Sequence, residues 1–207
     1  MGLDWIVGAK PKNPSDYDVL RRSFANRGDQ ALLDAWHAVP KINSWDTLEA
    51  PRVGSSAEAD AWFIAAHLDG ASPSEVSEWL GKNKGVAIVA LVKCDGVPPY
   101  TNAPMNRELE YTAFRGAFLA DMVPVFGDAM FKRAHENMLP PELLAFGTEL
   151  NEVAQRYAKE HGVVDAAAQY APPKDVESPA SLAHIMASAA RWCLFWAQRG
   201  HWLNTWW

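Results

Sequence analysis

The strongest constraint on the fold is a stretch near the C-terminus, residues 178–200, which reads SPASLAHIMASAARWCLFWAQRG. Ser178 is suited to cap the start of a helix, Pro179 fits the first helical position, and Gly200 can adopt the left-handed conformation that ends one. Apolar residues recur in it at three- and four-residue steps and extend onto the flanks. We therefore predict a helix here that is covered on several sides, as in the centre of a bundle.

Other segments also carry helical periodicity and end signals. The clearest are two capping boxes, Ser55 with Glu58 and Ser72 with Glu75. The segment VAIVALVK at 86–93 is too short to assign as strand or helix. Further helices are expected at 15–28, 29–39, 55–70, 72–81, 106–122, 128–137 and 139–162. The predicted fold class is mainly α: a single compact helical domain over residues 1–207, with at most a minor strand pair that would include 3–7.

Composition excludes several classes of protein. The chain has 207 residues, is 49% hydrophobic and carries a formal net charge of -6 with no basic run, so we expect no nucleic-acid partner. No apolar run approaches the roughly 20 residues of a membrane span, and the N-terminal patch is too short for a secretory signal. We therefore expect a cytoplasmic protein with no membrane association.

The two cysteines, Cys94 and Cys193, are too few for a disulfide framework and are expected to be thiols. No Cys-x-x-Cys or His-x-x-x-His pair offers metal ligands at a recognised spacing. We predict no cofactor and no metal site. A metal-dependent hydrolase, with ligands such as His135, Glu136 and Glu142, is the last of the alternatives.

Tryptophan is unusually frequent, with ten residues, and five of them lie in the last sixteen positions. Large rings there either complete the core or offer an adhesive surface to a partner. One alternative for function is therefore an interaction protein or homodimer that uses Trp202, Trp206 and Trp207 of the tail HWLNTWW.

Four short segments, MGLDW at the start, APRVG, KCDGVP and FRGAFL, together resemble an uncharacterised family of bacteria and large DNA viruses. The resemblance touches most of the chain, but only in short pieces. It implies no activity, and only that these four segments belong together.

Arg52, in the loop APRVG, and Arg115, between apolar neighbours, are candidate anion-binding residues. A poorly solvated guanidinium needs a carboxylate or a bound anion, because an unpaired buried charge is costly. Its planar fork suits phosphates and carboxylates equally. A structural ion pair is the alternative, with Asp121, Asp95 or Glu108 as possible partners.

Two further groups are candidates for chemistry. Cys94 and Asp95 open a long loop, where a thiol near a base could act as a nucleophile, although a plain buried or turn cysteine is the commoner case. A polar line along the C-terminal helix, spaced three and four residues apart, would line a polar cavity or form an interhelical hydrogen-bond network. Its members are Ser181, His184, Ser188 and Arg191.

From these observations we expect a cytoplasmic protein that binds or processes a small anionic ligand in a helix-lined pocket. The candidate ligand-binding residues are Arg52, Arg115, Ser188 and Arg191, and the candidate catalytic residues are Cys94, Asp95 and His184. Whether the protein is an enzyme stays open at this point.

Overall fold

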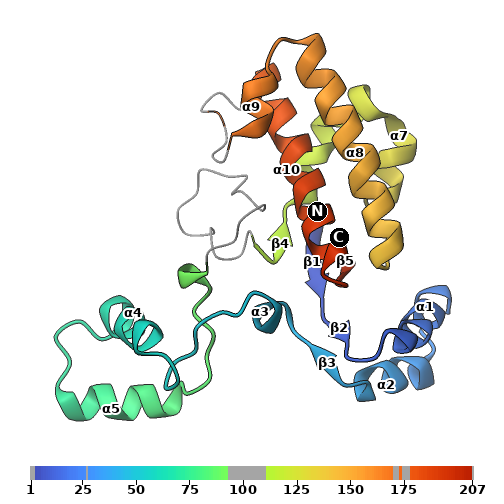
Figure 1. Ribbon diagram of the computed structural model, residues 1–207. Helices are drawn as coiled ribbons and strands as arrows, with labels where there is room; N and C mark the ends of the chain where they lie inside the picture. The colour runs from blue at the N-terminus through green and yellow to red at the C-terminus, as the bar shows by residue number, and fades with distance from the viewer. Residues whose placement is uncertain (1–2, 27, 93–110, 170–172, 174–177, 207) are drawn as a thin grey trace. The chain divides into compact units, whose positions relative to one another are not determined.

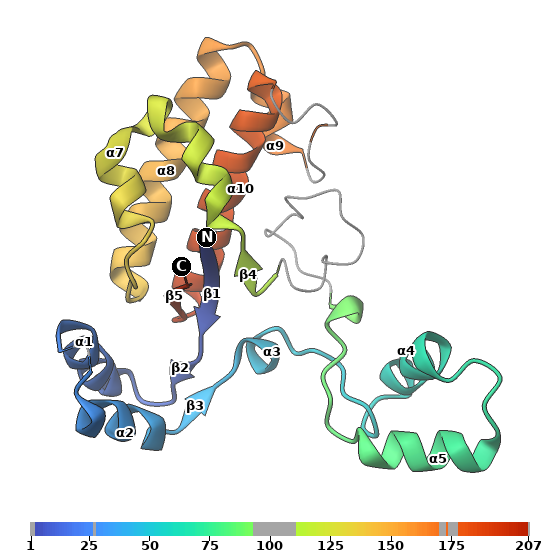
Figure 2. The ribbon, with the colours of Figure 1, turned by 180° about the vertical axis from the view of Figure 1, so that it is seen from behind.

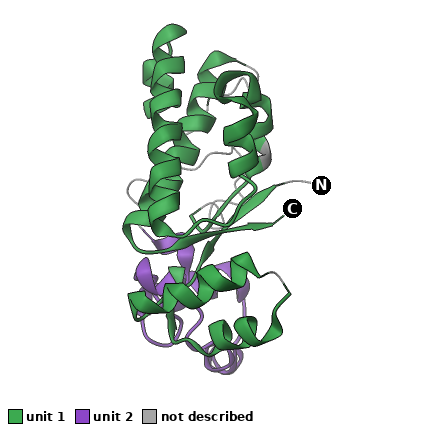
Figure 3. Cartoon of the chain, turned by 90° about the vertical axis from the view of Figure 1, so that its right-hand side faces the viewer, with its two compact units in different colours: residues 1–44, 95–207 green, residues 45–94 purple. Residues whose placement is uncertain are grey.

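The computed structural model describes residues 3–26, 28–92, 111–169, 173 and 178–206. By its contacts the chain divides into two compact units, residues 1–44 with 95–207 and residues 45–94 (Figure 3). Helices dominate the described residues, which confirms the mainly α fold class. The single domain over residues 1–207 stays a prediction.

The larger unit is formed by two stretches of the chain, one before and one after the smaller unit, and its elements are labelled in Figure 1. Before residue 45 they are β1 (Asp4–Gly8), β2 (Lys10–Pro11), the 3-10 helix η1 (Pro14–Asp16), α1 (Tyr17–Ala25), α2 (Gln30–Ala38) and β3 (Lys41–Ile42), and α3 (Ser44–Thr47) begins at the boundary. After the smaller unit they are β4 (Ala113–Phe114), the 3-10 helix η4 (Gly116–Met122), α7 (Val123–Arg133), α8 (Pro140–Glu160), α9 (Val164–Ala168), α10 (Pro179–Gln198) and β5 (Trp202–Trp206).

Helix α10 is the centre of this unit, as the sequence predicts. The Ser178 side chain accepts a hydrogen bond from the Ser181 backbone N–H at 3.2 Å, Pro179 occupies the first turn, and Gly200 has a φ of 76° just beyond the end. Most of its side chains are buried, and Trp192 and Trp196 are fully enclosed. Burial on several sides accounts for an apolar surface wider than one helical stripe.

Helix α8 packs side by side with α10 (Figure 1). The close approach requires a glycine, because a Cβ placed at Gly147 would lie 2.8 Å from the Cβ of Cys193. The helix predicted at 139–162 is confirmed, and its buried face runs from Leu143 to Ala158, whereas His161 is exposed beyond the helix end. This helix pair provides the rigid framework of the larger unit.

The two chain ends meet in a three-stranded antiparallel sheet of order β4-β1-β5 beside α10 (Figure 2). Trp5 pairs with Thr205 on one side and with Phe114 on the other, and its fully buried indole N–H donates to the Ala134 carbonyl at 2.8 Å. The strand expected near 3–7 is therefore present, in a sheet of three strands rather than a pair.

The helix predicted over 106–122 is wrong in its described part. Ala113 and Phe114 form a strand, and Gly116–Met122 is a 3-10 helix. Phe114 has helical spacing with its apolar neighbours, but it pairs with Trp5, and their ring centroids lie 5.3 Å apart. Pro124, just after this segment, lies in the first turn of α7.

Helices α1 and α2 pack together and against the start of β5. Asp29 caps α2 by accepting hydrogen bonds from the N–H groups of Ala31 and Leu32. Trp202, the first residue of β5, is only 9% exposed and lies in one cluster with Leu20 and Trp36. The first tryptophan of the tail thus completes a core.

The smaller unit holds α4 (Ala57–His67), α5 (Pro73–Lys82) and the 3-10 helix η2 (Val89–Leu91). The Ser72 and Glu75 capping box is present, whereas α4 is capped by Ser56 instead of Ser55. The ambiguous segment at 86–93 is neither a regular strand nor an α-helix in its described part: Ala87 makes a single antiparallel bridge to Arg52, and η2 follows.

Candidate functional site

A pocket of about 380 Å³ opens between α8, α9 and α10 in the larger unit. This is within the range of small-molecule sites in proteins. Its walls are mostly small apolar side chains, with two carboxamides and two cations among them. The lining residues are Asn151, Gln155, Ala158, Lys159, Val164, Ala167, Ala168, Ala187 and Arg191.

Arg191, on the third turn from the end of α10, is the most buried cation of this pocket. Its Nη1 donates to the carbonyl of Ala167 on α9 at 2.7 Å, and its Nη2 donates to the Ser188 Oγ at 3.1 Å. The Nε atom is buried and has no hydrogen-bond partner among the described residues. The two bonds hold the guanidinium plane in place and leave part of its donor fork unused.

No carboxylate neutralises this positive charge, since among the described residues neither Arg191 nor Lys159 takes part in an ion pair. Burial lowers the pKa of the Arg191 guanidinium from its ordinary value, yet an arginine stays protonated at neutral pH. A half-buried charge without a counter-ion attracts an anion, because its own desolvation is only partly offset by neutral acceptors.

Helix α8 adds a polar line to the same pocket. Asn151, Gln155 and Lys159 are spaced four residues apart, so they share one face over about 12 Å of helix. Their side chains offer amide donors and acceptors and a second positive charge. Asn151, Gln155 and Lys159 are not among the residues that the sequence selects as candidates.

Three of the four residues of the predicted line along α10, His184, Ser188 and Arg191, are in contact with one another through Ser188. The Ser188 Oγ lies 3.4 Å from the His184 Nδ1 and accepts the hydrogen bond from Arg191. His184 and Ser188 are almost fully buried. Ser188 therefore holds the Arg191 guanidinium, and His184 contacts Ser188 in turn. Of the predicted line, only Arg191 is among the described residues that line the pocket.

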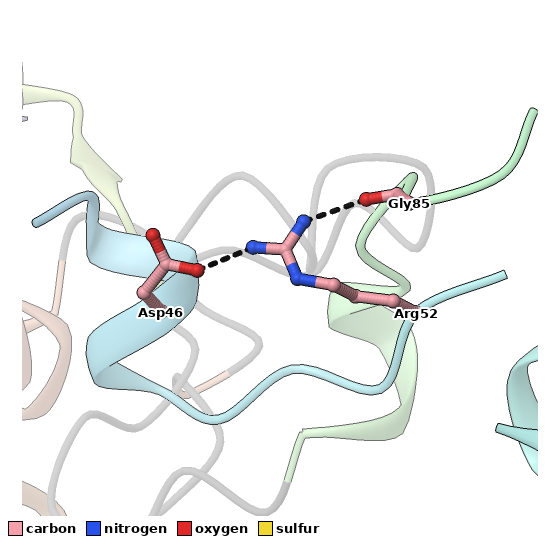
Figure 4. A network of polar contacts seen from close by, with 3 residues as sticks. All are labelled: Asp46, Arg52 and Gly85. Atoms are coloured by element: carbon pink, nitrogen blue, oxygen red, sulfur yellow. Dashed lines mark hydrogen bonds and ion pairs between the residues drawn. The ribbon is translucent and has the colours of Figure 1, made fainter. Parts of the chain in front are cut away.

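Arg52, one of the predicted anion-binding residues, belongs to the smaller unit (Figure 4). Its Nη2 forms an ion pair with Asp46 of α3, and its Nη1 donates to the Gly85 carbonyl at 2.6 Å. The structural alternative, an ion pair, is thus seen at Arg52, with a partner that the sequence prediction had not named.

Among the described residues, the predicted Arg115 is not part of the lining of the α8/α9/α10 pocket. Arg115 lies just before η4, is exposed, and has its guanidinium 5.8 Å from the centroid of the Phe118 ring. Cys94 and Asp95 lie outside the described residues. The thiol of Cys193 is fully buried between α8 and α10, and burial raises its pKa well above the ordinary range, so it is a core residue.

Within the part of the chain that the structure describes, no group of three or more His, Cys, Asp and Glu side chains is placed to hold a metal ion. His135 and Glu142 have structural contacts: the His135 Nδ1 lies 2.9 Å from the Phe131 carbonyl, and Glu142 accepts from the Leu139 N–H. No helix among the described residues has the length and apolar character required to span a bilayer.

The comparisons with known proteins identify no relative: no family model, curated protein or solved structure matches this chain. The resemblance of the four short segments therefore stays a prediction.

Proposed function

We propose that this chain is a cytoplasmic protein that binds a small anionic ligand in the α8/α9/α10 pocket. The observation that carries the proposal is the state of Arg191, a half-buried guanidinium that, among the described residues, has no carboxylate partner and bonds to two neutral oxygens. A ligand carboxylate would accept from the second N–H of Nη1 and of Nη2, which the bonds to Ala167 and Ser188 leave unused, in the two-pronged geometry that arginine favours.

The lining defines the rest of the ligand. Ala158, Val164, Ala168 and Ala187 offer apolar contact but no bulky ring, so the body of the ligand is small and aliphatic. Lys159 lies two helical turns beyond Asn151, which gives a second positive charge toward the other end of the α8 line. The class that fits is a carboxylate with a short aliphatic chain.

Titration calorimetry with hexanoate tests this proposal, with hexan-1-ol as the uncharged control of the same length. The wild-type protein should bind hexanoate in a saturable way and hexan-1-ol much more weakly. Arg191→Gln should lose about tenfold or more in hexanoate affinity, because hydrogen bonds to charged groups contribute about 1.5–3 kcal/mol. Lys132→Gln, an exposed cation on α7, is the matched control and should leave the affinity unchanged.

Equal binding of the acid and the alcohol, or equal affinities of wild-type and Arg191→Gln protein, would contradict the proposal. Thermal unfolding of both variants serves as the check that the fold is intact. A variant that unfolds is replaced by Arg191→Lys, which keeps the charge but lacks the planar fork and should weaken binding less than glutamine does.

A second candidate function, docking of a protein partner, is favoured by one observation at the tail. Trp206 at the end of β5 is 71% exposed, a large ring in water, whereas Trp202 is part of the core. Rings of this kind are enriched in protein interfaces. Of the tryptophans proposed from the sequence as a partner surface, Trp206 is therefore the one that is both described and exposed.

A further inference from the structure

A second pocket of about 390 Å³ lies in the same unit, between α1, α2 and β5, and no group of the proposed anion site contributes to it. We infer that this pocket binds an uncharged nitrogen heterocycle, a flat ring with neighbouring hydrogen-bond donor and acceptor atoms. The residues that carry the inference are Phe24, Trp36, Trp202, Ser23, Asn137 and Asn204.

Three aromatic rings form the apolar walls of this aromatic pocket. The centroid of Trp202 lies 5.3 Å from that of Phe24 and 6.3 Å from that of Trp36, the latter in an edge-to-face arrangement. Such rings present faces and edges on which another flat ring packs with additional electrostatic attraction.

The rings are held before any ligand arrives. Trp202 lies directly on Gly8, where any side chain would overlap the indole, and its Nε1 donates to the Ala9 carbonyl at 3.1 Å. Lys41 covers Trp36 with its ammonium 4.6 Å from the ring centroid. Walls fixed in this way need little reordering on binding, which favours affinity.

Hydrogen-bonding groups of the lining remain available. Among the described residues none hydrogen-bonds the Asn204 carboxamide, which follows Trp202 by two positions on β5 and therefore shares its face. The Asn137 Oδ1 accepts from Thr205, and no described residue accepts a hydrogen bond from its Nδ2. The oxygen of a free carboxamide can accept a hydrogen bond from a heterocycle while its nitrogen donates one to a neighbouring ring atom. Asparagine bonds adenine in this way.

The charge of the lining selects against ions. No Asp, Glu, Lys or Arg side chain is among the described residues that line the aromatic pocket, in contrast to the α8/α9/α10 pocket with its two cations. His37 is the only ionisable side chain among the described lining residues, so a charged ligand would lose its hydration for little electrostatic gain. An uncharged ring with polar edge atoms meets both the apolar walls and the free amides.

Calorimetric titration of the full chain tests the inference with two probes, adenine and indole. Adenine should bind with one-to-one stoichiometry and more tightly than indole, which has no adjacent donor and acceptor pair. Asn204→Ala should weaken adenine binding about tenfold or more and leave indole within about twofold. Phe24→Leu should weaken both probes, because it removes a ring wall.

The matched control is Asn151→Ala, which removes a carboxamide from the other pocket and should leave adenine binding unchanged. Asn204 has no side-chain bond within the described fold, so its variant should keep the wild-type melting temperature. Absence of saturable adenine binding overturns the inference, as does full adenine affinity in Asn204→Ala. Loss of adenine binding in Asn151→Ala would place the ligand in the α8/α9/α10 pocket and would overturn it as well.

Discussion

The guanidinium of Arg191 on α10 donates to the carbonyl of Ala167 on α9, 24 residues earlier in the chain, at 2.7 Å. The acceptor is a neutral backbone oxygen, so the contact orients the arginine without cancelling its charge. An arginine with a purely structural role more often meets a carboxylate, as Arg52 meets Asp46 in the smaller unit. This difference between the two arginines underlies the assignment of the α8/α9/α10 pocket as an anion site.

The contact between α8 and α10 should not tolerate a side chain at position 147. A Cβ on Gly147 would lie 2.8 Å from the Cys193 Cβ and 3.3 Å from the Leu194 backbone nitrogen, so Gly147→Ala should lower the free energy of unfolding by about 1–3 kcal/mol. The neighbouring exposed change Thr148→Ala should stay within about 0.5 kcal/mol. Denaturant unfolding measures both, and a neutral Gly147→Ala would contradict the close packing of these helices.

Stability should fall in mild acid because of His201. Burial lowers the pKa of this imidazole to about 4, with further lowering by Lys10 and Arg199, while its bond to the Gly8 carbonyl acts in the opposite direction. Between an unfolded pKa of 6.5 and about 4 the unfolded chain binds the additional proton. The contribution of neutral, buried His201 to the free energy of unfolding is therefore complete above pH 6.5 and is lost as the pH falls toward 4.

The measurement is the melting temperature from pH 7.5 to 4.5 for wild-type protein and for His201→Asn, which keeps a donor to Gly8 but does not titrate. The slope of the wild-type curve over this window should be steeper than that of the variant. Coincident slopes would show that His201 does not carry the effect. His37→Gln, at an exposed position, is the control and should follow the wild type.

The buried indole groups should differ in what their N–H contributes. The Trp5 Nε1 donates to the Ala134 carbonyl, whereas the buried Trp192 Nε1 has no hydrogen-bond partner among the described residues. Both rings are fully buried, so replacement by phenylalanine removes similar volume. Trp5→Phe should cost about 1–2 kcal/mol more than Trp192→Phe, because only Trp5→Phe leaves a buried carbonyl without its donor. Equal losses in denaturant unfolding would argue against this distinction.

Substitutions at Trp202 and Trp206 in the tail should have different effects on stability, because the first ring is buried and the second is exposed. Trp202→Ala should lower the free energy of unfolding by about 3–5 kcal/mol, as expected when a buried aromatic ring is removed. Trp206→Ser should change it by less than about 0.5 kcal/mol. If Trp206 docks a second copy of the chain, sedimentation of the wild type will show a dimer that Trp206→Ser converts to a monomer. An unchanged sedimentation profile would remove the support for that interface.

The sequence predicts those elements of the fold whose signals are local. Ser178, Pro179 and Gly200 define α10, and Ser72 with Glu75 defines the start of α5, because caps and periodicity lie within a few residues of the element they set. The strand at Phe114 could not be predicted this way. Its conformation depends on Trp5, more than a hundred positions earlier, and tertiary pairing overrides the local pattern.

The candidate site shows the same limit. The network of His184, Ser188 and Arg191 follows from helical spacing, and the structure confirms it. The pocket does not follow, because it forms only where α8 and α9 meet α10, and no spacing relates Asn151 to Arg191. A line of uncharged polar residues on α8 is the one signal that could have indicated it.

The most direct test of the anion site is an NMR titration of arginine Nε–Hε signals with hexanoate, in which the Arg191 signal is assigned by its loss in Arg191→Lys. This signal should move in a saturable way, because a carboxylate bound to the Nη1 and Nη2 N–H groups changes the charge distribution of the whole guanidinium. The Arg52 signal should stay in place, since its fork is already engaged. An unmoved Arg191 signal at saturating hexanoate would contradict the proposed function.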